Sequence, residues 1–164
     1  MELPVLKRLK KELQELLHEL NVKLPKELQE AAGHGDLSEN AEYDAAKLRQ
    51  EFVRARVAQI QVRIRELSLY TFASIPHGVV AYGSRVTVED NDGGATSEYR
   101  IVFPEEVDAA AGAISLGSPI GRALLNKEVG DEVEVQTPGG RKSYQIVGLV
   151  TLHQAADGTS DAKG

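Results

Sequence analysis

Leucine recurs along the first part of the chain at alternating steps of three and four residues. The members of this series are Leu6, Leu9, Leu13, Leu16 and Leu20. A later series has similar spacing and consists of Val53, Val57, Ile60, Ile64 and Leu67. Such spacing places apolar side chains on one face of a helix and is typical of a coiled-coil seam. The pattern therefore predicts two long helices within residues 1–69.

The segment between these two helices is short and rich in turn-forming residues. Gly33 and Gly35 end the first pattern, and Asp36 is the expected start of the second. A short connection favours antiparallel neighbours, so residues 33–40 become the tip of a helical hairpin about 40 Å long. We expect Pro25 to kink the first arm or to interrupt its hydrogen bonding.

The second half of the chain alternates apolar and polar positions, which is typical of strands. The expected strands are 79–89, 98–103, 113–116, 132–137 and 143–152. Pro138-Gly139-Gly140 is a hairpin signal between the last two. A short helix is expected over 119–127, with Ser118 as its N-cap and Pro119 at its first position. These elements predict a small antiparallel sheet with one helix.

Composition changes where the pattern changes. Residues 1–69 contain no Thr and two Gly, whereas most of the Gly, Val and Thr follow residue 78. We expect a coiled-coil rod over 1–69, a linker over 70–78, a sheet domain over 79–152 and a flexible tail over 153–164. The fold class is α+β.

Overall composition limits the classes of function. The 164 residues include no cysteine, which excludes a disulfide framework, a thiolate zinc site and a cysteine nucleophile. No signal peptide or membrane-length apolar run is present, so we expect a cytoplasmic protein without membrane association. A net charge of −6 disfavours tight binding to free nucleic acid. The four histidines are scattered without metal-ligand spacing.

Three carboxylates recur at steps of three residues in the expected tip: Asp36, Glu39 and Glu42. Spacing alone favours helix capping, with Asp36 as N-cap and Glu39 completing a capping box. The alternative is metal chemistry, since Mg²⁺ takes one or two protein carboxylates and fills its other positions with water and phosphate oxygens. Two tip carboxylates would not hold Mg²⁺ tightly alone, but could help fix a second ion where phosphate and a first metal are present.

Basic residues form two flanks along the second helix. Arg49, Arg56 and Arg63 repeat every seven residues, and Lys47, Arg54 and Arg65 lie on the other side. We favour ion pairing with Glu12, Glu15 and Glu19 across the hairpin, plus a solvated face. The alternative is guidance of an RNA or DNA backbone. Tyr43 is expected to pack under the tip rather than to stack on a base.

Two long motifs carry a family resemblance. The segment HGDLSENAEYDAAK, which begins at His34, closely resembles the tip of GreA/GreB-type transcript-cleavage factors, and SLGSPIGRALLNKEVGDEVEVQTPGG resembles their C-terminal signature. The resemblance runs from about Leu6 to Leu152. It implies an antiparallel coiled coil followed by an FKBP-like antiparallel sheet domain with one short helix. It also implies binding to bacterial RNA polymerase, with the rod entering the secondary channel.

The resemblance assigns roles to particular residues. The family's two essential acids correspond to Asp36 and Glu39, which would help hold a second Mg²⁺ inside the polymerase, which then cleaves its own backtracked RNA. Asn40, Glu42 and Tyr43 match the rest of the tip. Ser118, Pro119 and Ile120 match the segment that meets the polymerase. The nascent RNA 3′ end would be a further partner, although Ala32, Gly33 and Ser38 replace basic residues common in the family.

Three functional hypotheses follow. The first is a factor that stimulates cleavage by RNA polymerase, is no enzyme by itself, and acts as a monomer. The second is a non-cleaving or inhibitory paralogue that occupies the same channel, against which the retained Asp36 and Glu39 argue. The third is a prolyl isomerase, suggested by analogy of fold alone. An isomerase pocket needs several aromatic walls, and the second half offers only Tyr82, Tyr99, Phe103 and Tyr144.

Overall fold

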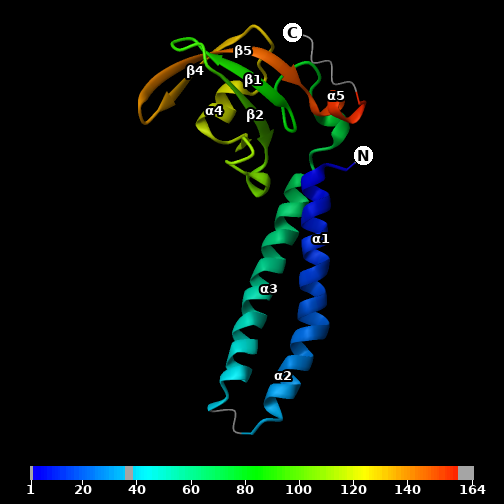
Figure 1. The fold of residues 1–164 in the computed structure, drawn as a ribbon. Helices are drawn as coiled ribbons and strands as arrows, with labels where there is room; N and C mark the ends of the chain where they lie inside the picture. Colours follow the sequence, from blue (N-terminus) through cyan, green and yellow to red (C-terminus); the bar gives the residue numbers. More distant parts are fainter. Residues whose placement is uncertain (1, 36–38, 159–164) are drawn as a thin grey trace. The chain divides into compact units, whose positions relative to one another are not determined.

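The computed structural model describes residues 2–35 and 39–158. The chain divides into two compact units, Met1–Phe72 and Ala73–Gly164. The first unit is helical and the second contains a sheet (Figure 1). This is the α+β class predicted from the sequence.

Two antiparallel arms form the helical unit (Figure 1). The first arm consists of α1 (Pro4–His18), a π-helical segment η1 (Glu19–Lys23) and α2 (Leu24–Ala32). The second arm is the single helix α3 (Ala41–Leu67), which contacts all three elements of the first arm. The predicted helical hairpin is confirmed.

Both predicted heptad series face the space between the arms. Leu24, Val53 and Val57 form a buried cluster. Four leucines pack against it: Leu13, Leu16, Leu17 and Leu20. Leu6 and Leu9 are buried in α1, as are Ile60 and Leu67 in α3. The apolar seam is therefore buried between the two arms of one chain.

Pro25 interrupts the first arm, as the sequence predicts. Proline brings no N–H to the helical hydrogen-bond ladder and clashes with the preceding turn. The structure responds with the π-helical segment η1, whose last turn is closed by a bond from the Leu24 N–H to the Glu19 carbonyl. The first arm is thus two α-helices joined by a wider turn rather than one continuous helix.

Five strands build the sheet of the second unit, in the order β3-β2-β1-β5-β4. Their bounds are β1 Arg85–Asp90, β2 Thr96–Val102, β3 Ala113–Ser115, β4 Glu132–Thr137 and β5 Gly140–Val150. The pairs β1–β2, β1–β5 and β4–β5 are antiparallel, and β2–β3 is parallel. The sheet is therefore mixed, which corrects the prediction of an antiparallel sheet: the long connection after β2 returns the chain in the same direction.

Helix α4 (Pro119–Leu124) covers one face of the sheet (Figure 1). The core beneath it consists of Val80, Val86, Val88, Ile101, Leu124, Val133 and Ile146. Gly121 permits this close approach, because a Cβ atom there would lie 2.1 Å from the Ser115 carbonyl oxygen. The packing of α4 therefore depends on the missing side chain of one glycine.

Several predicted boundaries in this unit are wrong. The expected strand over 79–89 begins only at Arg85, because the Ser84 N–H closes a turn on Ala81 O and Gly83 has a φ of +80°. The short helix ends at Leu124 rather than 127, and β5 begins at Gly140 rather than 143. Short 3-10 turns lie at η3 (Phe72–Ser74) and η4 (Pro104–Glu106).

The predicted flexible tail also needs correction. Helix α5 (Leu152–Ala156) follows β5 directly, and Thr151 and Gln154 form a capping box at its start. His153 is buried, and its Nε2 lies 2.7 Å from the Ile75 carbonyl oxygen. The chain is therefore ordered into 156, while residues 159–164 lie outside the described part.

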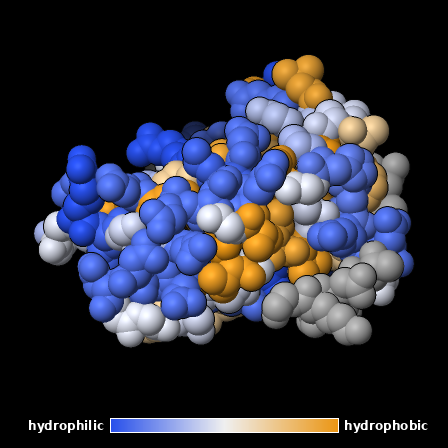
Figure 2. Space-filling model, turned by 90° about the horizontal axis from the view of Figure 1, so that it is seen from above, coloured by the Kyte–Doolittle hydropathy of each residue, from blue (hydrophilic) through white to orange (hydrophobic). Residues whose placement is uncertain are grey.

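The surface seen in Figure 2 is mostly hydrophilic, with a few hydrophobic areas between hydrophilic side chains. Within residues 2–35 and 39–158, no helix is both long and apolar enough to cross a membrane.

Candidate functional site

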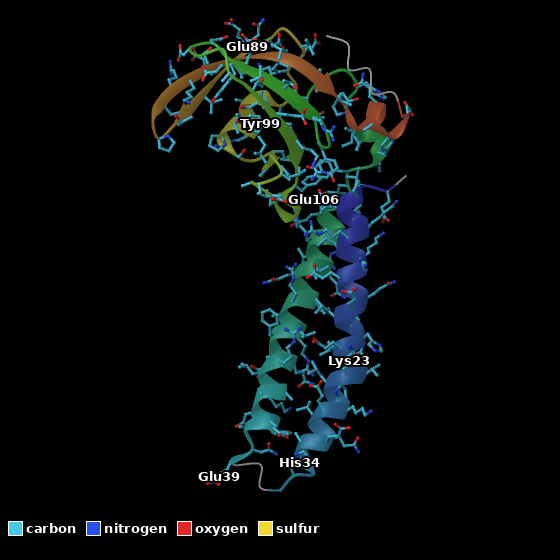
Figure 3. All side chains as sticks on the ribbon, viewed as in Figure 1. Lys23, His34, Glu39, Glu89, Tyr99 and Glu106 are labelled. Carbon is cyan, nitrogen blue, oxygen red and sulfur yellow. The ribbon has the colours of Figure 1, made fainter. Side chains whose placement is uncertain are left out.

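The candidate site is the connection between the two helical arms, where α2 ends at Ala32 and α3 begins at Ala41. Figure 3 labels His34 and Glu39 on either side of it. Asp36, the first predicted tip acid, lies outside the described residues together with Leu37 and Ser38. The geometry of the site is therefore built from the two flanks of this connection.

Asn40 is the N-cap of α3, so the prediction that the second helix starts at Asp36 is wrong. The Asn40 Oδ1 accepts a hydrogen bond of 3.0 Å from the Tyr43 N–H. The capping box expected from Asp36 and Glu39 would need Glu39 inside the first turn of this helix, but Glu39 precedes it. Capping of α3 therefore does not explain the presence of Glu39.

Glu39 is exposed. Among the described residues, its carboxylate has no hydrogen bond or ion pair. A solvated, unpaired carboxylate retains its full negative charge and its free lone pairs, which are what a hard cation requires. Glu39 is thus available to an external ligand, whereas the Glu42 carboxylate is paired with His34.

Two contacts tie the arms together across the connection. The Asn40 Nδ2 donates to the Ala31 carbonyl oxygen at 2.6 Å, and the Glu42 carboxylate lies 3.0 Å from His34 Nδ1. Glu42 is therefore held by a neighbour, in contrast to Glu39. Sequence reasoning missed His34, although its position eight residues before Glu42, across a tight connection, could have indicated the pair.

Tyr43 is half-buried, with the Lys47 ammonium 5.9 Å from its ring centroid. This position agrees with packing beneath the connection. The supporting roles expected for Asn40, Glu42 and Tyr43 in metal chemistry stay predictions.

Most basic residues on one flank of α3 are occupied within the hairpin. Arg49 makes a bidentate pair with Glu19, and Arg56 does the same with Glu12. Arg63 pairs with Glu66 of its own helix instead of Glu15. The prediction of ion pairing is confirmed for Arg49 and Arg56, and this flank has little charge left to guide a nucleic-acid backbone.

The second predicted contact segment lies at the start of α4. The Ser118 Oγ donates to the Ser115 carbonyl oxygen at 2.7 Å and accepts from the Gly121 N–H at 3.1 Å. Ser118 is therefore the predicted N-cap. Pro119 is exposed, while Ile120 is half-buried and packs against the core. Of these three side chains, Pro119 is the one best presented to a partner.

The structure brings together two of the scattered histidines. The rings of His77 and His153 stack with centroids 3.7 Å apart. Within the described part of the chain, no group of three or more His, Cys, Asp or Glu is arranged to hold a metal ion.

Comparison with known families decides the identity of this architecture. Residues 5–68 match "Transcription elongation factor, N-terminal", and residues 75–150 match "Transcription elongation factor, GreA/GreB, C-term". The chain belongs to the GreA/GreB family of transcription elongation factors. Each matched family segment coincides with one of the two units, so the helical hairpin and the mixed sheet are the two parts of a GreA/GreB-family protein.

Individual relatives support this membership. The transcription elongation factor GreA of Anaeromyxobacter sp. is 43% identical over 147 residues, which cover 90% of this chain and 89% of the relative. The GreA of Syntrophobacter fumaroxidans is 39% identical over 140 residues, covering 85% and 90%. The sequence of a solved structure, the GreA factor homolog 1 (Gfh1) of Thermus thermophilus, is 28% identical, and the match covers 88% of this chain and 94% of that one, with a TM-score of 0.41.

Proposed function

We propose that this GreA/GreB-family chain binds RNA polymerase through its secondary channel and stimulates the polymerase to cleave its own backtracked nascent RNA. The observation that supports the proposal best is the state of Glu39, which is exposed and has no partner among the described residues. Its neighbour Asn40 performs the capping that would otherwise account for acids at this place. An exposed carboxylate that neither caps a helix nor pairs with a neighbour is suited to a role in the active centre of a partner.

The chemistry of the donors fits magnesium. Glu39 offers a hard oxygen ligand, and Asp36 would supply a second one from outside the described residues. When bound in the polymerase, the ion would stabilise the negative charge that develops at the scissile phosphate. The chain's own contribution is to deliver two carboxylates at the end of a hairpin whose arms are tied by Asn40 and by the His34–Glu42 pair. Asn40, Glu42 and Tyr43 support the tip.

Binding and chemistry are divided between the two units in this proposal. Ser118, Pro119 and Ile120 provide the polymerase contact, and the Ser118 cap fixes the backbone that presents Pro119. The nascent RNA 3′ end is reached only by the tip. The chain alone does not cleave RNA, because two carboxylates lack the substrate positioning and the first metal ion of the polymerase.

The test uses a stalled elongation complex with backtracked RNA. Glu39→Gln keeps the size of the side chain and removes the charge that the ion needs, so cleavage stimulation should fall at least about tenfold, equivalent to roughly 1.4 kcal/mol of transition-state stabilisation. Asp36→Asn should behave in the same way. Competition with unmodified protein for polymerase should be unchanged.

Glu51→Gln is the matched control, since Glu51 is exposed on α3 away from the tip. This variant should stimulate cleavage by the polymerase as strongly as the unmodified chain does. If Glu39→Gln stimulated cleavage as fully as the unmodified chain, the proposed role of Glu39 would be wrong. If the unmodified chain binds polymerase but does not stimulate cleavage, it is instead the non-cleaving paralogue.

A further inference from the structure

The turn between β1 and β2 contains a pair of residues whose chemistry the proposed function does not use. The turn spans residues 90–95, and its middle is Asp92-Gly93. Glu89, labelled in Figure 3, lies just before it. An aspartate side chain can react with the backbone nitrogen of a following glycine, because glycine has no Cβ atom to hinder the approach. The chain contains one other Asp-Gly pair, Asp157-Gly158.

Hydrogen bonds fix the two ends of this turn. The Asp90 N–H donates to the Ala95 carbonyl oxygen, and the Gly94 N–H donates to the Asp90 carbonyl oxygen, both at 2.8 Å. Asn91 joins the turn to β5, because its N–H donates to the Ser143 carbonyl oxygen at 3.0 Å and its Nδ2 donates to the Ser143 Oγ at 2.7 Å. The turn is therefore held to both of its flanking strands and to a third.

The middle of the turn has no such restraint on its reactive groups. Asp92 and Gly93 are both exposed. Among the described residues, the Gly93 N–H donates to no acceptor, and the Asp92 carboxylate has neither a hydrogen bond nor an ion pair. The Asp92 N–H donates to the Asp90 Oδ1 at 2.9 Å, but this bond involves neither reacting group. The nitrogen and the carboxyl group that would react are therefore both unoccupied.

The second Asp-Gly pair differs in this respect. The Gly158 N–H donates to the Ala155 carbonyl oxygen at 3.4 Å, and the Asp157 N–H donates to the His153 carbonyl oxygen at 3.0 Å. Asp157 is the C-cap of α5, so the backbone of this pair belongs to the end of a helix. A nitrogen whose proton is hydrogen-bonded must release its acceptor before it can attack. The structure therefore distinguishes Asp92-Gly93 as the more reactive pair.

We propose that Asp92-Gly93 is a site of spontaneous isomerisation, at which the folded protein converts aspartate to isoaspartate. The Gly93 nitrogen attacks the Asp92 Cγ, and the proton of that nitrogen leaves with the carboxyl hydroxyl as water. The product is a cyclic imide, a succinimide. Water then opens the ring at the main-chain carbonyl, which becomes a free carboxylate, while Gly93 stays attached through the side-chain carbon. The water lost in the first step is regained in the second, and neither step is a redox reaction.

Isoaspartate makes the backbone of the turn longer by a methylene group. The added atom lies within the loop that the bond from the Gly94 N–H to the Asp90 carbonyl oxygen closes, so this bond should weaken first. The strands outside it, in which Glu89 lies opposite Thr96, should keep their register. The product also exposes a new carboxylate, which carboxyl methyltransferases specific for isoaspartate esterify with the methyl group of a sulfonium donor. The inference is independent of the proposed function, because the turn includes no residue of the tip or of α4.

Ageing of the full-length protein at neutral pH tests the proposal directly. Peptide mapping by reversed-phase chromatography separates the aspartate and isoaspartate forms, which have the same mass, and electron-transfer fragmentation distinguishes them. Isoaspartate should accumulate at Asp92 several-fold faster than at Asp157. An isoaspartate-specific carboxyl methyltransferase with labelled S-adenosylmethionine should transfer label to the peptide that contains Gly93, in proportion to the isoaspartate formed there.

Gly93→Ala is the variant that tests the reaction without disturbing the fold. A Cβ atom at Gly93 would meet nothing within 4 Å, and this glycine does not have the positive φ of Gly94. The added Cβ atom should therefore hinder ring closure only, and isoaspartate should form several-fold more slowly. Asp92→Glu should abolish the product, because its longer side chain closes the ring poorly. Gly139→Ala is the matched control in another turn, with its nearest contact at 3.9 Å, and should leave the rate at Asp92 unchanged.

Two results would overturn the proposal. One is an unmodified chain in which Asp92 isomerises no faster than Asp157. The other is an equal rate of isomerisation in the unmodified chain and in Gly93→Ala, with circular dichroism showing that both are folded. The first measurement needs no variant, so the proposal stays testable even if a substitution impairs folding. Neither measurement uses polymerase, so a failure of the proposed cleavage function would leave this result unchanged.

Discussion

The helical unit and the sheet unit are stabilised in different ways. The helical unit has one apolar seam between two arms, reinforced by ion pairs at the surface. In the sheet unit, α4 closes over the sheet, so that Ile101, Leu124 and Ile146 are completely buried. A closed core tolerates little change in volume, whereas two helices can shift to fill part of a gap. The surface around α4, which is the proposed polymerase contact, is therefore held by a closed core, whereas the tip is held by a few local contacts.

The largest loss of stability is expected from a substitution at Gly121, where the packing of α4 leaves no space for a side chain. Gly121→Ala introduces a Cβ atom at 2.1 Å from the Ser115 carbonyl oxygen, so the backbone around α4 must move. We expect a loss of about 3 kcal/mol in the free energy of unfolding of this unit, with no change in the helical unit. Hydrogen exchange resolved by residue measures both units in one experiment.

Gly117→Ala is the control for this change. Its Cβ atom would lie 3.6 Å from the Ser115 Oγ, an ordinary contact. Its effect should be close to zero. Equal losses for the two variants would show that the closed core is not what makes Gly121 sensitive.

A matched truncation compares the two cores directly. Val86 and Val53 are both fully buried, one in β1 and the other in α3. Val86→Ala should cost about 2.5 kcal/mol. Val53→Ala should cost about 1.5 kcal/mol or less, because alanine is the better helix former by roughly 0.5 kcal/mol and the arms can close on the gap. Exchange protection of each unit provides the measurement, and a larger loss for Val53→Ala would break the comparison.

The contacts at the tip should have intermediate effects. Asn40→Ala removes the N-cap of α3 and the bond to Ala31, and should destabilise the helical unit by about 1.5 kcal/mol. Asn40→Asp keeps an acceptor for the Tyr43 N–H but has no donor for Ala31. Chemical denaturation followed by circular dichroism should place Asn40→Asp between the unmodified chain and Asn40→Ala. Identical losses for both variants would assign the whole effect to the bond with Ala31.

The smallest effect is expected for the ion pairs on the helical unit. The side chains of Arg56 and Glu12 are each more than a third exposed, at 38% and 37%, so their pair is well solvated. A double-mutant cycle with Arg56→Gln and Glu12→Gln should give a coupling energy of about 0.5 kcal/mol. The coupling should decrease in high salt. A coupling that is large and independent of salt would mean that the seam needs more than apolar packing.

Local patterns in the sequence were sufficient for the helical hairpin but not for the position of its second N-cap. Asp36 and Asn40 are both good caps, and the local pattern favours Asp36, because Glu39 follows it by three residues whereas Tyr43 follows Asn40. The choice of Asn40 depends on its contact with Ala31 on the other arm, which no local pattern contains. Glu39 has no capping role because Asn40 is the cap. The sequence alone therefore could not predict that the Glu39 carboxylate is unpaired.

Two features of the sheet unit were not predicted from the sequence, and the reasons differ. The parallel pairing of β2 and β3 depends on the path of the chain between them, which alternation does not reveal. Helix α5, in contrast, had a readable signal, since Thr151 and Gln154 have the spacing of a capping box. The small polar residues that follow it obscured that signal. Strand β4 shows no such conflict, and its predicted bounds, 132–137, match the structure.

The π-helical segment Glu19–Lys23 gives the helical unit a mechanical asymmetry. One arm contains a joint at this segment, while α3 runs through 27 residues without a break. Under a force applied at the end of such a hairpin, the continuous helix α3 should resist bending. The first arm should bend more easily at its π-helical segment. Bending then converts into sliding of α2 along α3. The two flanks of the tip would move past each other along the helix axis before they separate.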